Sequence, residues 1–212
     1  MPAPLDAVLV IHNAFRRDMM EIDDAAYKVA KHGGDLSPVL QRLHFHSKIL
    51  MLHAEGEEEA VFPAVDKVAP LVAKAYAIDH DELDMMNEGL EKVMGAPDEL
   101  AAARATAALW AHLRIHLSKE DVHLYPILRE RISEAEQAPI VGLMASKVPP
   151  EMMPNFVDWI MRLLDQDDRE TMTHVWMDLM PEEVMAGVKP LIRDSIVAED
   201  WAELTKRIPK LG

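Results

Sequence analysis

The spacing of apolar residues predicts a chain that is almost entirely helical. In the first stretch, apolar residues recur every three or four positions, which places them on one face of a helix. This stripe stops at Gly33-Gly34, a pair that commonly ends a helix. We therefore expect a first helix that ends there. Its stripe consists of Leu5, Val8, His12, Phe15, Met19, Ile22, Ala26 and Val29.

Capping and turn residues predict three further long helices. Ser37-Pro38 has the form of an N-cap followed by proline at the first helical position, and starts a second helix that runs towards Val65. A third helix fits from about Pro70 to Met94. The fourth runs from the turn around Pro97-Asp98 to about Arg131. Four long helices with short loops are typical of an up-down-up-down bundle, so we predict an all-α fold with a four-helix bundle over residues 1–135.

The last part of the chain, residues 136–212, has a different composition. It holds seven of the fourteen prolines, three of the four tryptophans and eight of the fifteen methionines. Prolines at this density predict a C-terminal extension of short helices, with starts near Pro150-Glu151 or Pro154, Asp167-Asp168 and Pro181-Glu182. The methionines fit packing, and the extension is also a candidate to cap the bundle or to contact a second copy or a protein partner.

One sequence phrase occurs twice. His53 and Glu57 are followed by Phe62-Pro63, and His116 and Glu120 are followed by Tyr125-Pro126. Residues four positions apart lie on one helix face, roughly 6 Å apart along the axis. Two such helices that face each other could hold a pair of metal ions.

Histidine positions indicate that the four helices meet at one level. Two residues at the same height of an antiparallel helix pair are equally far from the turn, so their mean position falls on it. The means are 32.5 for His12 and His53, 66.5 for His53 and His80, and 98 for His80 and His116. All three fall on turns placed from Gly and Pro alone. Buried imidazoles and carboxylates at this level would be costly without a metal ion.

Composition excludes several other kinds of site. The net charge of -15 argues against nucleic acid and against anionic membrane surfaces, which require clustered Lys and Arg. The chain has no cysteine, so any metal must be held by nitrogen and oxygen ligands. The N-terminus lacks the features of a secretory signal, and no apolar run approaches the length of a membrane span, so we expect a cytoplasmic protein.

With these motifs, residues 5–132 resemble the hemerythrin family, in particular its bacterial HHE branch. The resemblance implies a non-heme diiron site with an oxo or hydroxo bridge, which meets a small oxidant such as O2, H2O2 or NO. It implies that Glu57 and Glu120 bridge the irons and that histidines fill the outer positions. The implied histidine ligands are His12, His53, His80 and His116.

The chain departs from the oxygen carriers of that family in two places. These carriers have two histidines four residues apart on the third helix, whereas Tyr76 stands one turn before His80 here. We therefore consider Tyr76 as a phenolate ligand or as a residue packed against the irons. The carriers also place their second carboxylate where this chain has Asp121, so Asp121 is an outer candidate beside Glu120. His112 is a candidate to donate to a ligand or to line the pocket.

Other polar residues are interpreted as structural. The unit Glu120-x2-His123 matches ferritin-like diiron proteins, but that plan requires a second copy that the chain lacks. In the acidic run at residues 55–59, only Glu57 is expected to point inward. The histidines expected to be structural are His44, His46, His123 and His174.

Three classes of function follow from these predictions. A binding or sensing protein would take up O2 or NO reversibly, and an iron-storage module would hold iron without turnover. An enzyme would decompose peroxide, as a catalase does, or oxidise an organic substrate. A metal-free interaction module would leave the buried polar cluster unexplained.

Overall fold

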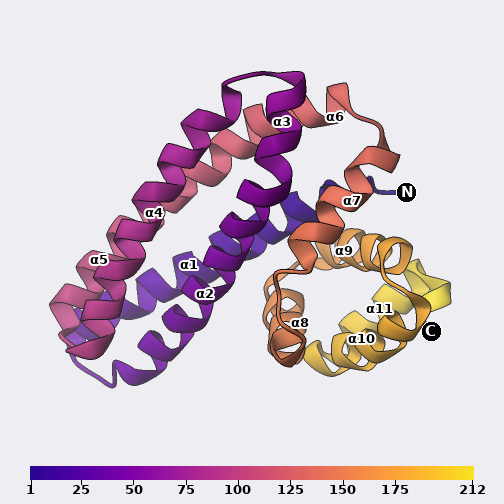
Figure 1. Ribbon diagram of the computed structural model, residues 1–212. Helices are drawn as coiled ribbons and strands as arrows, with labels where there is room; N and C mark the ends of the chain where they lie inside the picture. The colour runs from indigo at the N-terminus through magenta and orange to yellow at the C-terminus, as the bar shows by residue number, and fades with distance from the viewer. The chain divides into compact units, whose positions relative to one another are not determined.

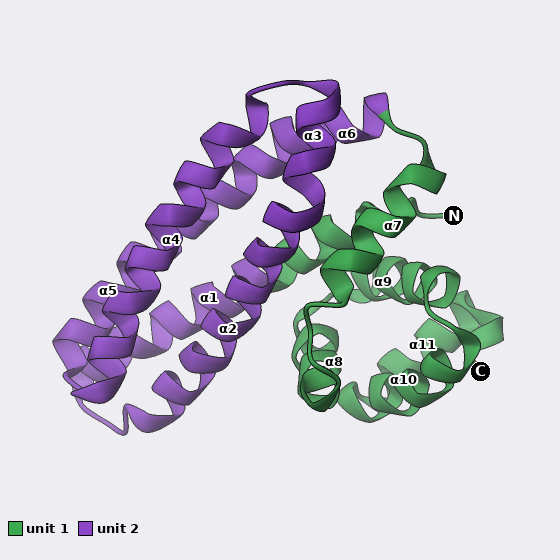
Figure 2. Cartoon of the chain, in the orientation of Figure 1, with its two compact units in different colours: residues 1–14, 132–212 green, residues 15–131 purple.

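The computed structural model describes residues 1–212, which form helices and no strands (Figure 1). The chain divides into two compact units (Figure 2). Unit 1 consists of residues 1–14 and 132–212, and unit 2 of residues 15–131. The first helix, α1 (Asp6–His32), begins in unit 1 and continues in unit 2. The prediction of an all-α fold is confirmed.

Unit 2 contains the predicted long helical segments, which alternate in direction along the chain (Figure 1). After α1 come α2 (Ser37–Gly56) and α3 (Phe62–Val68), joined without a break by a π-helical turn, Glu57–Val61. After α4 (Val72–Gly95), α5 (Glu99–Lys119) passes through a second π-helical turn, Glu120–Leu124, into α6 (Tyr125–Arg131). Helix α5 packs along α4, and α3 lies beside α6.

The turns between these helices have clear local causes. Gly33 adopts a φ of 75° and its N–H donates to the Val29 carbonyl at 2.8 Å, which ends α1. The Asp98 carboxylate accepts the Ala101 N–H at 2.6 Å and caps α5. The expectation for Ser37 was wrong in one detail. Ser37 is the first residue of α2, and its own N–H donates to the Asp35 carboxylate at 2.9 Å.

Both π-helical turns lie where the repeated phrase places its proline. Pro63 and Pro126 have no N–H, so each leaves the carbonyl four residues earlier without its α-helical partner. The preceding aromatic residues donate five residues back instead, Phe62 to the Glu57 carbonyl and Tyr125 to the Glu120 carbonyl. Such turns are frequent at functional sites. Here each begins at a glutamate of the repeated phrase.

The interior of unit 2 is mostly apolar, apart from the histidines and glutamates at one level and a few buried polar residues such as Asp18, His46 and Thr106. The α1 stripe is core as far as Ala26, since Phe15, Met19, Ile22 and Ala26 are fully buried, whereas Val29 is only half-buried. Leucines from the other helices pack against this interior, which excludes water. The helices α1 and α2 are also joined by an ion pair between Asp18 and Arg42 at 2.5 Å. The buried leucines include Leu43, Leu83, Leu113, Leu117 and Leu128.

Unit 1 contains five short helices after residue 132. They are α7 (Glu134–Ala145), α8 (Met153–Leu163), α9 (Gln166–Leu179), α10 (Glu182–Ser195) and α11 (Ala198–Arg207). Single 3-10 turns occupy Pro150–Met152 and Pro209–Leu211. The starts of α8, α9 and α10 agree with the predicted positions.

The sequence analysis predicted no start for α11 or for α7, and α7 contains Pro139. A capping box between Ser133 and Glu136 starts this helix and was the available signal. The core of unit 1 uses Met161 and Met172 as buried filling. Phe156 packs against Trp159 and Trp176 at ring-centroid distances of 5.9 and 6.5 Å. Across both units, every helix is too short or too polar to cross a membrane.

Candidate metal centre

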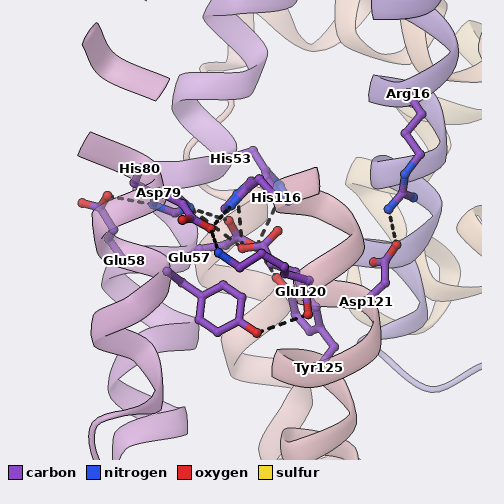
Figure 3. Close-up of polar contacts among 12 residues, drawn as sticks. Arg16, His53, Glu57, Glu58, Asp79, His80, His116, Glu120, Asp121 and Tyr125 are labelled. Carbon is purple, nitrogen blue, oxygen red and sulfur yellow. Dashed lines mark hydrogen bonds and ion pairs between the residues drawn. The ribbon is translucent and has the colours of Figure 1, made fainter. Parts of the chain in front are cut away.

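Four side chains with metal-binding atoms meet inside the bundle. They are Glu57, His80, His116 and Glu120, and one ligand atom from each lies within 4.8 Å of the others (Figure 3). Glu57 begins the π-helical turn after α2, and His80 lies on α4. His116 lies near the end of α5, and Glu120 begins the π-helical turn that follows it. All four are buried.

A second group of ligand atoms shares one member with the first. His12, His53 and Glu57 also bring ligand atoms within 4.8 Å of one another, and all three are buried. The two groups together contain the six residues that the sequence selected as metal ligands. Glu57 is common to both groups.

The two oxygens of Glu57 face different histidines. Oε1 lies 3.4 Å from Nε2 of His53, and Oε2 lies 3.4 Å from Nε2 of His80. The Tyr125 hydroxyl donates a hydrogen bond to Oε1 (Figure 3). Burial raises the pKa of Glu57, but the imidazoles of His53 and His80 lower it by more, so the net shift is well below the usual range. Glu57 is therefore ionised and lies between the imidazoles of His53 and His80.

The pKa of Glu120 is shifted in the opposite direction from that of Glu57. Its Oε1 lies 3.4 Å from Nε2 of His116 and 3.9 Å from Nε2 of His80. Burial raises its pKa well above the usual range, and the negative charge of Glu57 adds to the shift. Without a metal ion, the interior therefore favours one ionised carboxylate and one protonated carboxyl group.

Two acidic side chains hold imidazoles from the side opposite the cluster. The Glu58 carboxylate lies 2.9 Å from Nδ1 of His80, and the Asp79 carboxylate lies 3.3 Å from Nδ1 of His116 (Figure 3). A carboxylate at one ring nitrogen favours a proton there and leaves the other nitrogen free to bind a metal. The expectation that Glu58 belongs to a solvated face was therefore incomplete. Its position directly after Glu57 was the available signal.

One buried nitrogen atom of the cluster supports a bound metal ion. Nε2 of His80 is buried and makes no hydrogen bond, although it faces the carboxylates of Glu57 and Glu120. A buried polar atom left in this way is unfavourable unless a ligand occupies its lone pair. The imidazole and carboxylate donors suit iron, and also zinc or manganese. The residues present therefore fit two metal ions that share Glu57.

The Tyr76 hydroxyl faces the backbone of a neighbouring helix. Its hydroxyl donates to the backbone carbonyl of Lys119 at 3.2 Å. Burial raises the pKa of Tyr76 to about 12, and the charges of Glu120 and Asp79 contribute to the shift. A neutral phenol that donates to the backbone favours the other alternative, a residue packed beside the cluster.

The remaining two candidates lie outside both groups. The Asp121 carboxylate accepts a hydrogen bond from Arg16 on α1 (Figure 3). The His112 ring stacks on His116 with 6.3 Å between centroids, and its Nδ1 lies 3.4 Å from the Glu82 carboxylate. Neither residue belongs to the two ligand groups, so both stay candidates for residues around the cluster.

Two residues near the cluster were not selected from the sequence as site residues. Tyr125 was noted only as part of the repeated phrase, yet its hydroxyl contacts Glu57. Phe15 packs edge-on against both His46 and His53, with centroids 5.4 and 5.3 Å away. His46 is fully buried and its Nδ1 lies 2.8 Å from the Asp18 carboxylate, which agrees with a structural role. The aromatic position of the repeated phrase was the signal for Tyr125.

Proteins similar to this chain include long plant proteins. The zinc finger protein BRUTUS of Arabidopsis thaliana is 28% identical over 190 residues, which cover 85% of this chain and 15% of that protein. Two BRUTUS-like zinc finger proteins of the same species are 24% and 25% identical, over 82% and 85% of this chain. The chain thus spans about 15% of the length of these curated relatives. No solved structure matches the chain.

The similarity to the BRUTUS proteins also reaches beyond the bundle. An alignment that covers 85% of 212 residues must continue well past residue 128. At least part of the C-terminal helices therefore has a counterpart in those proteins, which the sequence alone did not reveal.

The family comparison agrees with the buried histidines and glutamates. The family described as the hemerythrin HHE cation binding domain matches residues 3–128, which is more than half of the chain. This range contains all six residues of the two ligand groups. The chain belongs to the hemerythrin HHE cation-binding family.

Proposed function

We propose that this protein binds two iron ions in the bundle and that the iron pair binds or reacts with a small oxidant. One ion would be held by His12, His53 and Glu57. The other would be held by Glu57 together with His80, His116 and Glu120. The resemblance implied Glu120 as a second bridge, but its Oε1 faces His80 and His116 and it belongs to this group alone, so the proposal assigns it to one ion. The proposal rests above all on Glu57, because one of its oxygens faces His53 and the other faces His80. A carboxylate in that position suits two ions that share a ligand.

Burial of the ligands supports a small oxidant as the molecule that binds. The six side chains are at most 8% exposed, so an organic substrate of ordinary size has no direct access to the ligand atoms. O2, NO and H2O2 are small enough to diffuse into a packed interior. When bound, the iron pair would supply electrons and open coordination positions for such a molecule.

The surrounding residues would hold the ligands and one proton. Glu58 and Asp79 would keep Nε2 of His80 and His116 available to the metal. Burial raises the pKa of Tyr125 well above the usual range, with further contributions from Glu57 and Glu120, so its hydroxyl keeps its proton beside Glu57. A fixed proton donor at this place supports an enzymatic alternative in which peroxide is decomposed.

The same site is compatible with sensing or storage. A sensing or storage protein would bind the oxidant or the iron without turnover, and the fold alone does not distinguish these roles from catalysis. The names of the relatives refer to zinc fingers. This chain has no cysteine, so it does not contain a cysteine-ligated zinc finger. The proposal for this chain therefore concerns its histidine and glutamate cluster.

The first experiment is elemental analysis of the purified protein, with a visible spectrum before and after dithionite. We expect two irons per chain and a ferric charge-transfer band that disappears on reduction. Protein from iron-rich medium that is fully helical but contains no metal would contradict the proposal. A long-wavelength phenolate band that is lost in Tyr76→Phe would restore Tyr76 as a ligand.

A second experiment separates binding from catalysis. The iron-loaded protein is mixed with H2O2, and oxygen release is followed over many equivalents. Multiple turnovers that are lost in Glu57→Ala would indicate a peroxide-decomposing enzyme. Reversible spectral changes with O2 or NO and no turnover of peroxide would indicate a binding or sensing protein.

A further inference from the structure

A chain of contacts connects His116 to the protein surface. Nδ1 of His116 faces Asp79, Asp79 contacts the Lys119 ammonium, and Lys119 lies against Tyr76. We propose that Asp79, Lys119 and Tyr76 position His116 and set its strength as an iron ligand. This inference rests on the proposed iron site and assigns three positioning residues to it.

The contact between Asp79 and His116 fixes the orientation of the His116 imidazole. Asp79 Oδ2 lies 3.3 Å from Nδ1 of His116, while Glu120 Oε1 lies 3.4 Å from its Nε2. With the proton held on Nδ1, the lone pair of Nε2 points at the cluster. The negative charge of Asp79 also makes the imidazole a stronger electron donor, as carboxylates behind metal-bound histidines generally do.

The contact between Lys119 and Asp79 weakens the effect of Asp79 on His116. The Lys119 ammonium donates to the same Oδ2 atom of Asp79 that faces His116. A cation on that oxygen withdraws negative charge from the hydrogen bond to the imidazole. Lys119 therefore weakens the donation that Asp79 gives to His116. The Asp79 side chain is 16% exposed, so solvent screens this contact only in part.

The third contact holds Lys119 in place. The Tyr76 hydroxyl donates to the Lys119 carbonyl at 3.2 Å, and the Lys119 ammonium lies 5.5 Å from the centroid of the Tyr76 ring. The ring face attracts the cation and the backbone contact fixes the residue that carries it. Tyr76 would thus act on the site through Lys119 and Asp79 and would remain a neutral phenol.

Glu58 gives an internal comparison for Asp79. It contacts Nδ1 of His80 in the same way, but its side chain is 52% exposed, and its contact is therefore screened by water. We expect replacement of Asp79 to change the site more than replacement of Glu58.

The test measures iron affinity and midpoint potential in matched variants. Asp79→Asn should weaken iron binding about 10-fold to 100-fold and raise the potential, because the imidazole donates less to ferric iron. Lys119→Met should lower the potential, and Lys119→Arg should keep it near the wild-type value. Asp81→Asn is the control, since Asp81 is an exposed carboxylate beside His80 that has no contact with His116. Equal results for Asp79→Asn and Asp81→Asn would overturn the inference.

A double variant tests whether Lys119 acts through Asp79. If it does, Lys119→Met should shift the potential much less when Asp79→Asn is already present. Additive shifts would mean that Lys119 acts directly on the irons, and would contradict the chain of contacts. A loss of folding would not produce potential shifts of opposite sign in the two single variants.

Nitrogen NMR of the metal-free protein separates this inference from the proposed function. At about pH 9, above the ordinary imidazole pKa of about 6.5, His116 should carry its proton on Nδ1 in the wild type. In Asp79→Asn the two tautomers should mix. The same tautomer in both proteins would overturn the inference, whether or not iron binds. Absence of iron binding together with the expected tautomers would contradict only the proposed function.

Discussion

The two copies of the repeated phrase share a backbone but differ in chemistry. Each has a histidine, a glutamate four residues later, a π-helical turn and then an aromatic residue before proline. Yet the pKa of Glu57 is lowered and that of Glu120 is raised, and only Glu57 belongs to both ligand groups. Sequence spacing therefore determines the position of a ligand, and the surrounding side chains determine its charge.

The aromatic residues account for part of this difference. The Phe62 ring packs against the His80 ring with 5.0 Å between centroids. At the equivalent place in the other copy, Tyr125 donates a hydrogen bond to Glu57. Glu57, in the first copy, thus accepts a hydrogen bond from Tyr125 of the second copy. The two copies are consequently complementary, and we expect equivalent substitutions in them to have different effects.

The largest difference is expected in metal content. Glu57→Ala removes the residue shared by both ligand groups, so we expect the loss of both irons. Glu120→Ala removes a member of one group, and we expect about one iron per chain to remain. The measurement is elemental analysis of the purified variants, with circular dichroism to establish that the helices are intact.

The control for these variants is Glu59→Ala, an exposed glutamate on the same π-helical turn as Glu57. We expect it to retain two irons. Equal iron loss in Glu57→Ala and Glu120→Ala would contradict the idea that Glu57 alone is shared.

The next effect concerns the hydroxyl of Tyr125. Tyr125→Phe removes the donor to Glu57 in a fully buried position and should reduce the free energy of unfolding by about 1.5 to 3 kcal/mol. Urea unfolding of the metal-free protein measures this change. Phe62→Leu is the comparison in the other copy, where no hydrogen bond is lost. A Tyr125→Phe variant as stable as the wild type would show that Glu57 does not depend on this hydroxyl.

The sequence predicted the helices and the six clustered residues because both depend on regular spacing. Apolar periodicity and Gly or Pro turns located the four long segments, and the mean positions of His12, His53, His80 and His116 placed these histidines at one level. Helix α7 was missed because Pro139 is normally a reason to end a helix. Its start depends on a local capping box rather than on periodicity.

The contacts around the cluster could not be predicted in the same way. Glu58 and Glu59 are chemically identical neighbours, and which of them reaches His80 depends on the widened π-helical turn. The Tyr76 hydroxyl reaches a backbone carbonyl of another helix, which no side-chain pattern records. Such contacts depend on the detailed packing of helices far apart in the sequence.

The metal-free protein should show opposite pH effects in the two copies. The raised pKa of Glu120 means that the folded state binds its proton more tightly than the unfolded state does. Its contribution to stability is complete below the unfolded pKa of about 4.3 and is lost as pH rises through the folded pKa. For Glu57 the pKa is lowered, so the contribution is present above about pH 4.3 and is lost as pH falls through the folded pKa.

Two variants measure this difference. At pH 7 and with a chelator present, Glu120→Gln should increase the free energy of unfolding by on the order of 1 kcal/mol. Glutamine is neutral, so folding no longer has to bury a carboxylate or bind a proton to neutralise it. Glu57→Gln should decrease it by a similar amount. Unfolding in urea at pH 7 and pH 4 provides the values, and changes of the same sign in both variants would contradict the assigned charges.

The smallest effect concerns the residues that follow the two glutamates. Glu58 contacts His80, whereas Asp121 contacts Arg16, and the Asp121 pair is partly exposed with side chains 22% and 23% accessible. Asp121→Asn should therefore retain two irons and an unchanged spectrum, and should reduce the free energy of unfolding by no more than about 1 kcal/mol. Arg16→Ala is the matched variant, because it removes the same ion pair from the other side. Iron loss in Asp121→Asn but not in Arg16→Ala would identify Asp121 as a ligand. Small and equal losses of stability in both would mean that Asp121 only joins α1 to the π-helical turn of the second copy.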